Sequence, residues 1–280
     1  MAAPAPLGTP PFRLPGGVGM PRIGIGTWRM GEEAADEATE IAALRRALDR
    51  GFTHLDTAEM YGEGGAETVL GKAIAGEDRA RLFITSKFYP WHATADAMEA
   101  ACQRSLRRLG TDWLDLYLLH WPGGTPMEET LEGAARLKAR GVIRAFGVSN
   151  VDASDMKALA RRGLLEGIEV NQVMHNPARR GIEVDLLPLL EEHGIACMAY
   201  TPIEPRTMAG NAAFREIAGA EGLSPAGLAL GRACPIPKAA TLAHVDELAD
   251  AAARRLSAET MAAIDRAFPR PERPVPLDII

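Results

Sequence analysis

The sequence is poor in cysteine and in aromatic residues, and it has no long apolar run. Its three cysteines, Cys102, Cys197 and Cys234, are widely spaced and lack the spacing of metal ligands. Such a pattern is typical of reduced thiols and argues against a disulfide framework. No segment is apolar over the length that crosses a bilayer, and the N-terminus lacks the basic and apolar parts of a secretory signal. We therefore expect a cytoplasmic protein with no metal and no membrane contact.

A concentration of charge of one sign is also missing. The 280 residues carry 31 basic and 37 acidic side chains, for a net charge of -6, and no basic stripe stands out. Nucleic acid is therefore not an expected partner. With 47% hydrophobic residues the chain can form one large core. We expect an Ala/Pro-rich flexible leader over 1–11, a single domain over 12–280, and a monomer, since no surplus apolar surface is evident.

Short β-rich runs alternate with helical segments from Ile23 onwards. The runs span 22–26, 53–57, 82–87, 114–120, 143–149, 168–172 and 195–200. They are apolar nearly throughout, which is typical of parallel strands covered on both faces. Helical periodicity is visible over about 33–50 and over 94–109, where Met98, Cys102, Leu106 and Leu109 form one stripe. A glycine precedes each following run and is expected to end the helix before it.

Seven such units, with an eighth near Ile236, predict an α/β fold of the (β/α)8 TIM barrel type. The alternative is an open doubly wound sheet, which usually has a glycine-rich turn that opens a helix after its first strand. Here Gly26 is followed by Thr27 and Trp28 instead. The segment 11–17, PFRLPGG, is expected to form a short hairpin that closes the bottom of the barrel.

Four ionisable residues follow three successive strands of this predicted barrel. Asp56 and Tyr61 follow the second strand, Lys87 the third and His120 the fourth. Each residue alone has an ordinary reading, such as a helix cap, a surface lysine or a packed ring. Strand ends on one face of a parallel barrel converge, however, so the four side chains are expected to share one pocket.

A phenol beside an ammonium group is a potential proton donor. Lys87 can stabilise the phenolate of Tyr61 and lower its pKa from about 10, and Asp56 can keep the lysine charged. His120 can hydrogen-bond a substrate oxygen and orient it. Together these groups could protonate an oxygen that gains negative charge, as a carbonyl oxygen does when the carbon receives hydride.

Several strings of the sequence resemble the aldo-keto reductases. DTAEMYG (56–62), SK (86–87) and LLHWP (118–122) are similar to the blocks that carry the family's catalytic tetrad. GVSN (147–150), NQ (171–172), Tyr200 in YTPI and IPK (236–238) match later blocks in order. The resemblance extends from about Gly17 to Pro269 and is strongest to bacterial members that resemble methylglyoxal reductase. It implies a barrel reductase that takes hydride from NADPH, without a Rossmann domain, and reduces small aldehydes or ketones.

The resemblance also implies a role for each matching residue. Tyr61 would be the acid, Asp56 and Lys87 would tune it, and His120 would orient the carbonyl. Ser149, Asn150 and Gln172 would hold the nicotinamide carboxamide, with Tyr200 stacked on the ring. The remaining cofactor contacts would come from Gly26, Thr27, Asp56, Thr201, Pro202, Ile203, Ile236, Lys238, His244 and Glu247. The substrate pocket would be lined by Trp28, Tyr61, His120 and Trp121.

The sequence departs from the family where the adenosine 2'-phosphate would bind. Lys238 and Glu247 are kept, but Ala239, His244 and Leu248 stand at the usual Ser, Arg and Asn positions. A guanidinium group binds phosphate better than an imidazole does. NADPH is the expected cofactor, and this difference leaves the use of NADH open.

The eighth unit is also shorter than in the family. The run 224–238 must end a helix, turn and supply a strand, yet Pro235 and Pro237 flank Ile236. Proline is unfavourable inside a central strand. We expect a shortened eighth βα unit, imperfect closure of the barrel and a mobile loop at 231–238.

Two other functions are consistent with a barrel of this kind. One is a nucleotide-binding regulatory subunit with little turnover, which would need a partner-binding extension. The other is a lyase that forms a Schiff base on Lys87, which would need an unpaired, readily neutral lysine. The predicted partner Asp56 argues against that lyase.

Overall fold

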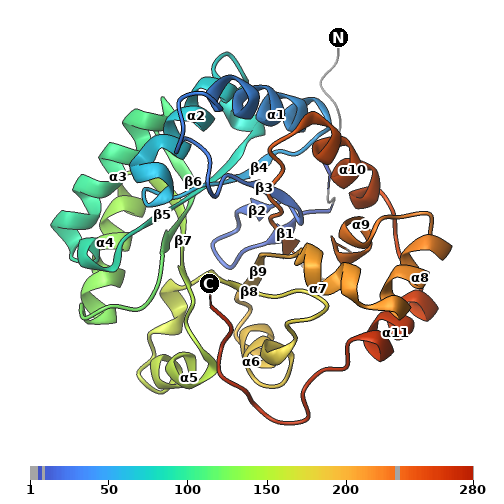
Figure 1. Ribbon diagram of the computed structural model, residues 1–280. Helices are drawn as coiled ribbons and strands as arrows, with labels where there is room; N and C mark the ends of the chain where they lie inside the picture. The colour runs from blue at the N-terminus through green and yellow to red at the C-terminus, as the bar shows by residue number, and fades with distance from the viewer. Residues whose placement is uncertain (1–5, 8–9, 231–233, 280) are drawn as a thin grey trace.

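A ring of helices surrounds a parallel sheet in the computed structural model, which describes residues 6–7, 10–230 and 234–279 (Figure 1). The strands of this sheet are β3 (Gly24–Gly26), β4 (His54–Asp56), β5 (Phe83–Phe88), β6 (Leu114–Leu119), β7 (Ile143–Ser149), β8 (Val170–Met174), β9 (Ala196–Tyr200) and β10 (Cys234–Pro235). Within the described ranges, these eight strands lie in chain order and pair in parallel. This order confirms the predicted (β/α)8 barrel, because an open doubly wound sheet changes direction at a switch point.

The helices follow the strands as the hydrophobic periodicity predicts. Their bounds are α1 (Glu37–Asp49), α2 (Gly65–Ile74), α3 (Ala95–Leu109), α4 (Met127–Ala139), α5 (Ala153–Arg161), α6 (Leu186–Glu192), α7 (Pro205–Gly210), α8 (Ala212–Ala220), α9 (Pro225–Ala229), α10 (Leu242–Ala252) and α11 (Ala258–Ala267). Short 3-10 turns lie at η1 (Tyr61–Gly64), η2 (Arg79–Arg81), η3 (Pro90–His92), η4 (Leu165–Gly167) and η5 (Gly181–Glu183). The predicted stripe of α3 is buried, and the helix ends at Gly110, whose φ of 66° is left-handed. The first helix begins at Glu37, later than the expected Glu33, because residues 34–36 form a turn.

Both faces of the sheet are buried, which explains why its strands are mostly apolar. In β6, Leu116 and Leu118 belong to the cluster inside the barrel, whereas Tyr117 and Leu119 belong to the cluster between sheet and helices. Successive side chains of a strand point to opposite faces, so a strand covered on both sides favours apolar residues on both faces.

A hairpin closes the N-terminal end of the barrel, as predicted. It consists of β1 (Phe12–Arg13) and β2 (Gly19–Met20), which pair antiparallel. Leu14 and Met20 insert into the cluster inside the barrel, and the Gly16 N–H donates to the Glu169 carboxylate at 2.9 Å. Residues 1–5 and 8–9 of the predicted leader lie outside the described residues, so that domain boundary remains a prediction.

The eighth strand is short and closes the barrel through few contacts. β10 pairs with β9, and the Ile236 N–H donates to the Ala199 carbonyl at 3.1 Å. Across the seam, the Gly26 N–H donates to the Pro237 carbonyl at 2.8 Å, and an isolated bridge joins Gly26 to Lys238. Pro237 therefore gives β3 a carbonyl acceptor, but as a proline it has no N–H to donate. The shortened unit is as predicted, while part of the loop expected to be mobile, 231–233, lies outside the described residues.

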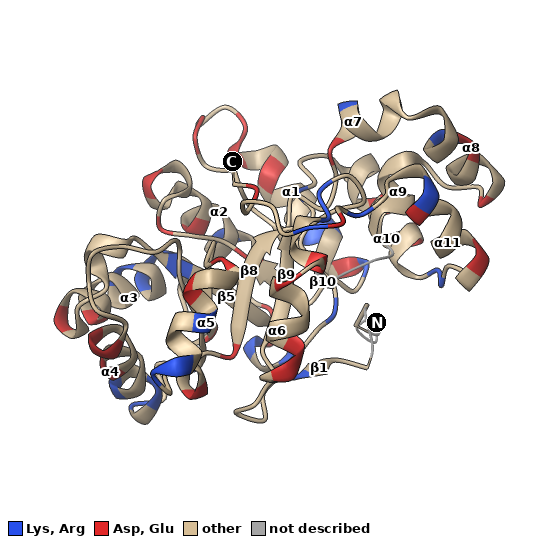
Figure 2. Cartoon of the chain, turned by 90° about the horizontal axis from the view of Figure 1, so that it is seen from below, with Lys and Arg blue, Asp and Glu red and all other residues tan. Residues whose placement is uncertain are grey.

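Acidic and basic side chains alternate over the outer helices rather than gathering by sign (Figure 2). The segment after α11 returns to the centre of the ring, at the end of the barrel opposite the hairpin (Figures 1 and 2). Its Asp278 forms an ion pair with Arg179 at 3.3 Å. Among the described residues, no helix is long and apolar enough to span a membrane.

Candidate active site

Three of the four predicted residues form a continuous hydrogen-bonded chain at the C-terminal end of the barrel. The ammonium group of Lys87 donates to Asp56 Oδ1 at 2.6 Å, to the Thr57 carbonyl at 3.0 Å and to the Tyr61 hydroxyl oxygen at 3.1 Å. Gln172 Nε2 donates to the second oxygen of Asp56 at 2.8 Å. Because β4 ends at Asp56 and Lys87 lies near the end of β5, parallel pairing alone brings the two side chains together.

Burial and pairing act in opposite directions on Lys87. The side chain is 0% exposed, and burial alone would remove its charge. The carboxylate of Asp56 and the hydroxyl of Tyr61 outweigh this effect and hold the pKa of Lys87 above its ordinary value. The lysine is therefore charged, which is the opposite of what a Schiff-base nucleophile requires.

A tight turn aims Tyr61 at the barrel axis. The backbone of Gly62, Glu63 and Gly64 is left-handed there, with φ of 56°, 52° and 92°. Lys87 Nζ lies 4.7 Å from the centroid of the Tyr61 ring. Burial raises the pKa of Tyr61 above its ordinary value, although the charge of Lys87 acts against it. Lys87 thus has the predicted effect on the phenol, but burial exceeds it, and Tyr61 is protonated at neutral pH.

His120 is a neutral imidazole next to this chain. It is 7% exposed, and burial together with the charge of Lys87 lowers its pKa to about 2. Its ring meets the ring of Tyr61 edge-on, with centroids 5.7 Å apart. Nδ1 is buried and has no hydrogen-bond partner in the part of the chain that the structure describes. A neutral imidazole can donate one hydrogen bond and accept another, so it can bind and orient an oxygen without supplying charge.

A polar network holds the residues predicted to bind the nicotinamide amide. Ser149 Oγ donates to the Gln172 carbonyl at 2.8 Å, and the Asn150 amide nitrogen donates to the His120 carbonyl at 3.1 Å. The Tyr200 hydroxyl donates to Asn150 Oδ1 at 2.8 Å. Asn150 has a left-handed backbone, with φ of 59°, and this conformation places its amide against β6. The ring of Tyr200 is thereby tied at its hydroxyl end, while its residue lines the cavity described next.

A cavity of about 570 Å³ joins the proton-transfer residues to the predicted cofactor residues. Asp56, Tyr61, His120 and Trp28 line it, together with every predicted cofactor residue except Thr27. The Thr27 hydroxyl instead donates to the Asp56 carbonyl at 3.1 Å, behind the wall. Lys87 is also behind the wall and contacts the wall residues Asp56 and Tyr61.

Several wall residues were missed by sequence reasoning. They are Met60, Pro205, Ala226 and Pro237, and Leu248 belongs with them as a position noted only for its difference from the family. Met60 could have been found, since it lies between two predicted residues in DTAEMYG. Pro205 is the first residue of α7 and Ala226 lies in the first turn of α9, where no motif marks them.

The end of the cavity predicted to meet the 2'-phosphate carries residues that differ from the family's usual phosphate-binding set. Lys238, His244 and Glu247 line it, whereas Ala239 is buried in the core away from it. The Thr241 hydroxyl accepts a hydrogen bond from the His244 N–H at 3.3 Å and caps α10. Burial lowers the pKa of Lys238. Among the described residues, the basic side chains that line this end are thus one lysine and one imidazole.

Aromatic side chains gather beside His120. The ring of Trp121 lies 5.0 Å from that of His120, and it meets Tyr89 and Trp91 at 5.7 and 6.0 Å between centroids. Trp121 does not line the cavity, whereas Trp28 does and is 40% exposed. Tyr89 and Trp91 follow the end of β5, a position that sequence reasoning overlooked.

Fold and site together define a class of protein. They are those of a (β/α)8 barrel whose strand ends hold a buried Asp–Lys–Tyr hydrogen-bonded chain beside a cavity that Lys238 and His244 also line. Over the described residues no group of three or more His, Cys, Asp and Glu side chains is placed to hold a metal ion.

Comparison with known sequences identifies the family. The sequence model of the aldo/keto reductase family matches residues 22–268, and the chain belongs to this family. It is 43% identical to the methylglyoxal reductase YeaE of Escherichia coli K12, over 96% of this chain and 98% of that protein.

Solved structures agree with this assignment. An aldo/keto reductase of Klebsiella pneumoniae crystallised with NADP and acetate matches with a TM-score of 0.90 and 45% identity, over 96% of this chain and 99% of that one. Another from the same organism, crystallised with NADPH, matches with a TM-score of 0.89 and 43% identity over 100% of both chains.

Proposed function

We propose that this chain reduces small aldehydes and ketones of the methylglyoxal type with NADPH. The observation that carries the proposal is the chain Asp56–Lys87–Tyr61, which ends at a phenol on the cavity wall. Similarity to a methylglyoxal reductase and to structures with NADP or NADPH supports the substrate class and the cofactor.

Tyr61 would donate the proton and His120 would orient the carbonyl oxygen. Bound NADPH would supply the hydride, so that negative charge develops on that oxygen. The hydroxyl of Tyr61 would neutralise this charge, and the ammonium of Lys87, 3.1 Å from the phenol oxygen, would stabilise the phenolate that remains. Asp56 would keep Lys87 charged. The neutral His120 would hydrogen-bond the oxygen without competing as an acid, because its pKa is about 2.

The cavity fits an extended dinucleotide. Ser149, Asn150 and Gln172 would hold the nicotinamide amide, and Tyr200 would pack against the ring. Lys238 and His244 lie in the same cavity and would meet the 2'-phosphate end. An imidazole binds phosphate less tightly than a guanidinium group does, so we infer a weaker preference for NADPH over NADH than an arginine at 244 would give.

The test is consumption of NADPH with methylglyoxal and a panel of aldehydes, followed by absorbance. Wild type should turn over, and Tyr61→Phe should lose at least ~100-fold in kcat while it still binds NADPH, measured by nucleotide fluorescence. Turnover that is retained in Tyr61→Phe would refute the assignment of Tyr61 as the proton donor. NADPH that binds and is never consumed would instead favour the regulatory-subunit alternative.

We also infer that the enzyme is a single domain over 12–280, monomeric and cytoplasmic. Cys102 and Cys197 are free thiols, and burial raises the pKa of both to about 12, which suits a reducing compartment without requiring it. Light scattering on the purified full chain, with fractionation of the source cells, would test both inferences.

A further inference from the structure

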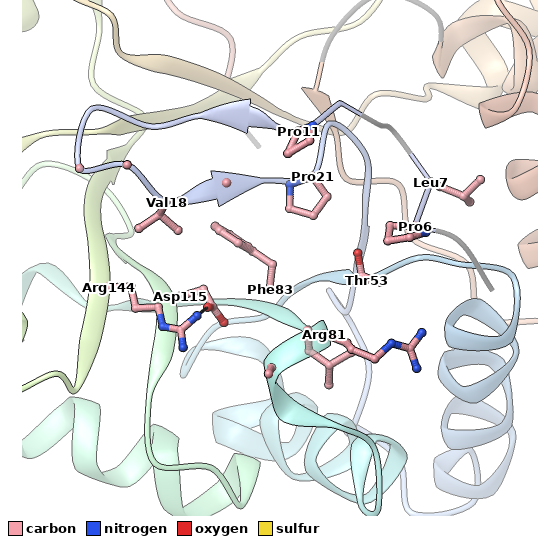
Figure 3. A pocket seen from close by; sticks show the side chains of 15 residues that line it. Pro6, Leu7, Pro11, Val18, Pro21, Thr53, Arg81, Phe83, Asp115 and Arg144 are labelled. Atoms are coloured by element: carbon pink, nitrogen blue, oxygen red, sulfur yellow. Dashed lines mark hydrogen bonds and ion pairs between the residues drawn. The ribbon is translucent and has the colours of Figure 1, made fainter. Parts of the chain in front are cut away.

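A second cavity lies at the opposite end of the barrel, beneath the hairpin of β1 and β2 (Figure 3). Its volume is about 530 Å³, and it shares no lining residue with the candidate active site. Pro11, Val18, Pro21 and Phe83 give it apolar walls. The size is within the range of ~300–1,000 Å³ that is typical of small-molecule sites.

The hydroxyl of Thr53 faces this space. Thr53 is 4% exposed, and its hydroxyl makes no hydrogen bond with residues 6–7, 10–230 or 234–279. In Figure 3 its oxygen points between Pro21 and Pro6, from the strand side toward the hairpin side. A hydroxyl that reaches the cavity and forms no bond within the described chain is available to a ligand group at this point.

The wall carries surplus positive charge. The single carboxylate there, Asp115, is buried and already accepts from Arg79 at 2.7 Å, Arg144 at 3.0 Å and the Ile84 N–H at 2.9 Å. Arg81 also lines the cavity, and its guanidinium group makes no hydrogen bond or ion pair with the described part of the chain. In the wall, Arg81 and Arg144 thus accompany one acid, and a neutral or cationic ligand would leave the surplus positive charge unpaired.

We propose that this cavity binds a small carboxylate with an apolar body. The carboxylate would pair with Arg81 or with the free nitrogens of Arg144 and would accept from the Thr53 hydroxyl. The apolar body would pack against Phe83 and Val18. Arginine and hydroxyl donors suit an oxyanion, and the apolar walls favour an aromatic or branched body over an inorganic ion.

The experiment is calorimetric titration of the full chain with phenylacetate, without nucleotide and with saturating NADPH. Phenylacetate should bind in both cases, because the two cavities are separate. Phenylacetamide, which has the same shape without the charge, should bind at least ~10-fold more weakly. Arg81→Met should weaken phenylacetate binding by ~10-fold or more, and Thr53→Val, which keeps the shape, by ~3- to 10-fold.

Matched variants at the other end of the barrel separate this site from the active site. Trp28→Ala and His120→Gln should leave phenylacetate binding unchanged, and Thr53→Val should keep wild-type circular dichroism and NADPH binding. Displacement of phenylacetate by NADPH would assign the carboxylate to the active site and overturn the proposal. The same conclusion would follow if His120→Gln lost phenylacetate binding while Arg81→Met kept it. No binding to wild type, or equal binding of phenylacetamide, would overturn it as well.

Discussion

Replacing Asp56 with Asn is the sharpest test of how the candidate active site is held together. The substitution keeps size and shape but removes the only carboxylate that contacts the buried ammonium group of Lys87, 2.6 Å away, within the described residues. The Thr57 carbonyl and the Tyr61 hydroxyl remain as partners, and both are neutral. A buried charge would therefore lose its counter-ion while keeping two hydrogen bonds.

The expected cost is large. Breaking a buried ion pair by removing one partner costs about 3–5 kcal/mol, and the two remaining oxygens place Asp56→Asn near the lower end. Against a typical total stability of ~5–15 kcal/mol this is a substantial part, and it corresponds to a fall in Tm of roughly 6–10 °C. The pKa of Lys87 should fall at the same time, because burial then acts without the opposing carboxylate.

Equilibrium unfolding in urea measures this cost, and a double-mutant cycle isolates it. Lys87→Met alone should also destabilise the protein, since it leaves the carboxylate of Asp56 with only Gln172. The double variant Asp56→Asn/Lys87→Met should be more stable than the sum of the single effects predicts, by at least ~2 kcal/mol. Single variants within ~1 kcal/mol of wild type, or additive effects, would refute the idea that the pair is a buried, mutually dependent charge pair.

Three further outcomes follow from the same structure. His54 is fully buried with a pKa of about 4, below its unfolded value near 6.5, so the unfolded chain binds more protons between these values. The contribution of His54 to the free energy of unfolding is therefore fully present above pH 6.5, and it should fall by about 3 kcal/mol as the pH drops through 4. Urea unfolding at each pH would measure this loss, which should be smaller in His54→Gln. The pKa of His120 is about 2 and that of Tyr61 is raised, so kcat/KM for carbonyl reduction should be constant from pH 5 to pH 9 and decline only above pH 9. A decline of kcat/KM below about pH 6 that disappears in His120→Gln would contradict a neutral imidazole. His244→Arg should raise the ratio of kcat/KM with NADPH to that with NADH by ~10-fold, and an unchanged ratio would show that this position does not meet the 2'-phosphate.

The four central residues were predictable because their positions depend on topology rather than on side-chain detail. Once parallel strands were recognised, Asp56, Lys87 and His120 had to converge at one end of the barrel. The acidity of Tyr61 was not predictable in the same way. It depends on a balance between burial and the charge of Lys87, and burial is a property of the packed structure.

Side chains at the mouth of the site were harder to predict. Thr27 and Trp121 follow strand ends as the wall residues do, yet one turns to the Asp56 carbonyl and the other packs beside His120. The direction of a loop side chain depends on local turns that no spacing records. Tyr89 and Trp91 were missed for the same reason. The second cavity has no motif at all, because the hairpin that covers it comes from a different part of the chain than Thr53 and Arg81.

The shortened eighth strand links the fold to the cofactor more directly than its length suggests. Pro235 and Pro237 looked unfavourable in a strand, but the Ile236 N–H donates to β9 and the Pro237 carbonyl accepts from β3, so neither bond requires a proline N–H. The junction between β3 and the segment after β10 is thus formed by few hydrogen bonds. This junction lies in the wall of the cavity, with Gly26 on one side and Lys238 on the other. A dinucleotide bound along that wall would contact both sides of the junction. Ligands that bind only the folded state stabilise it, so the cofactor itself would complete the closure that two prolines leave sparse.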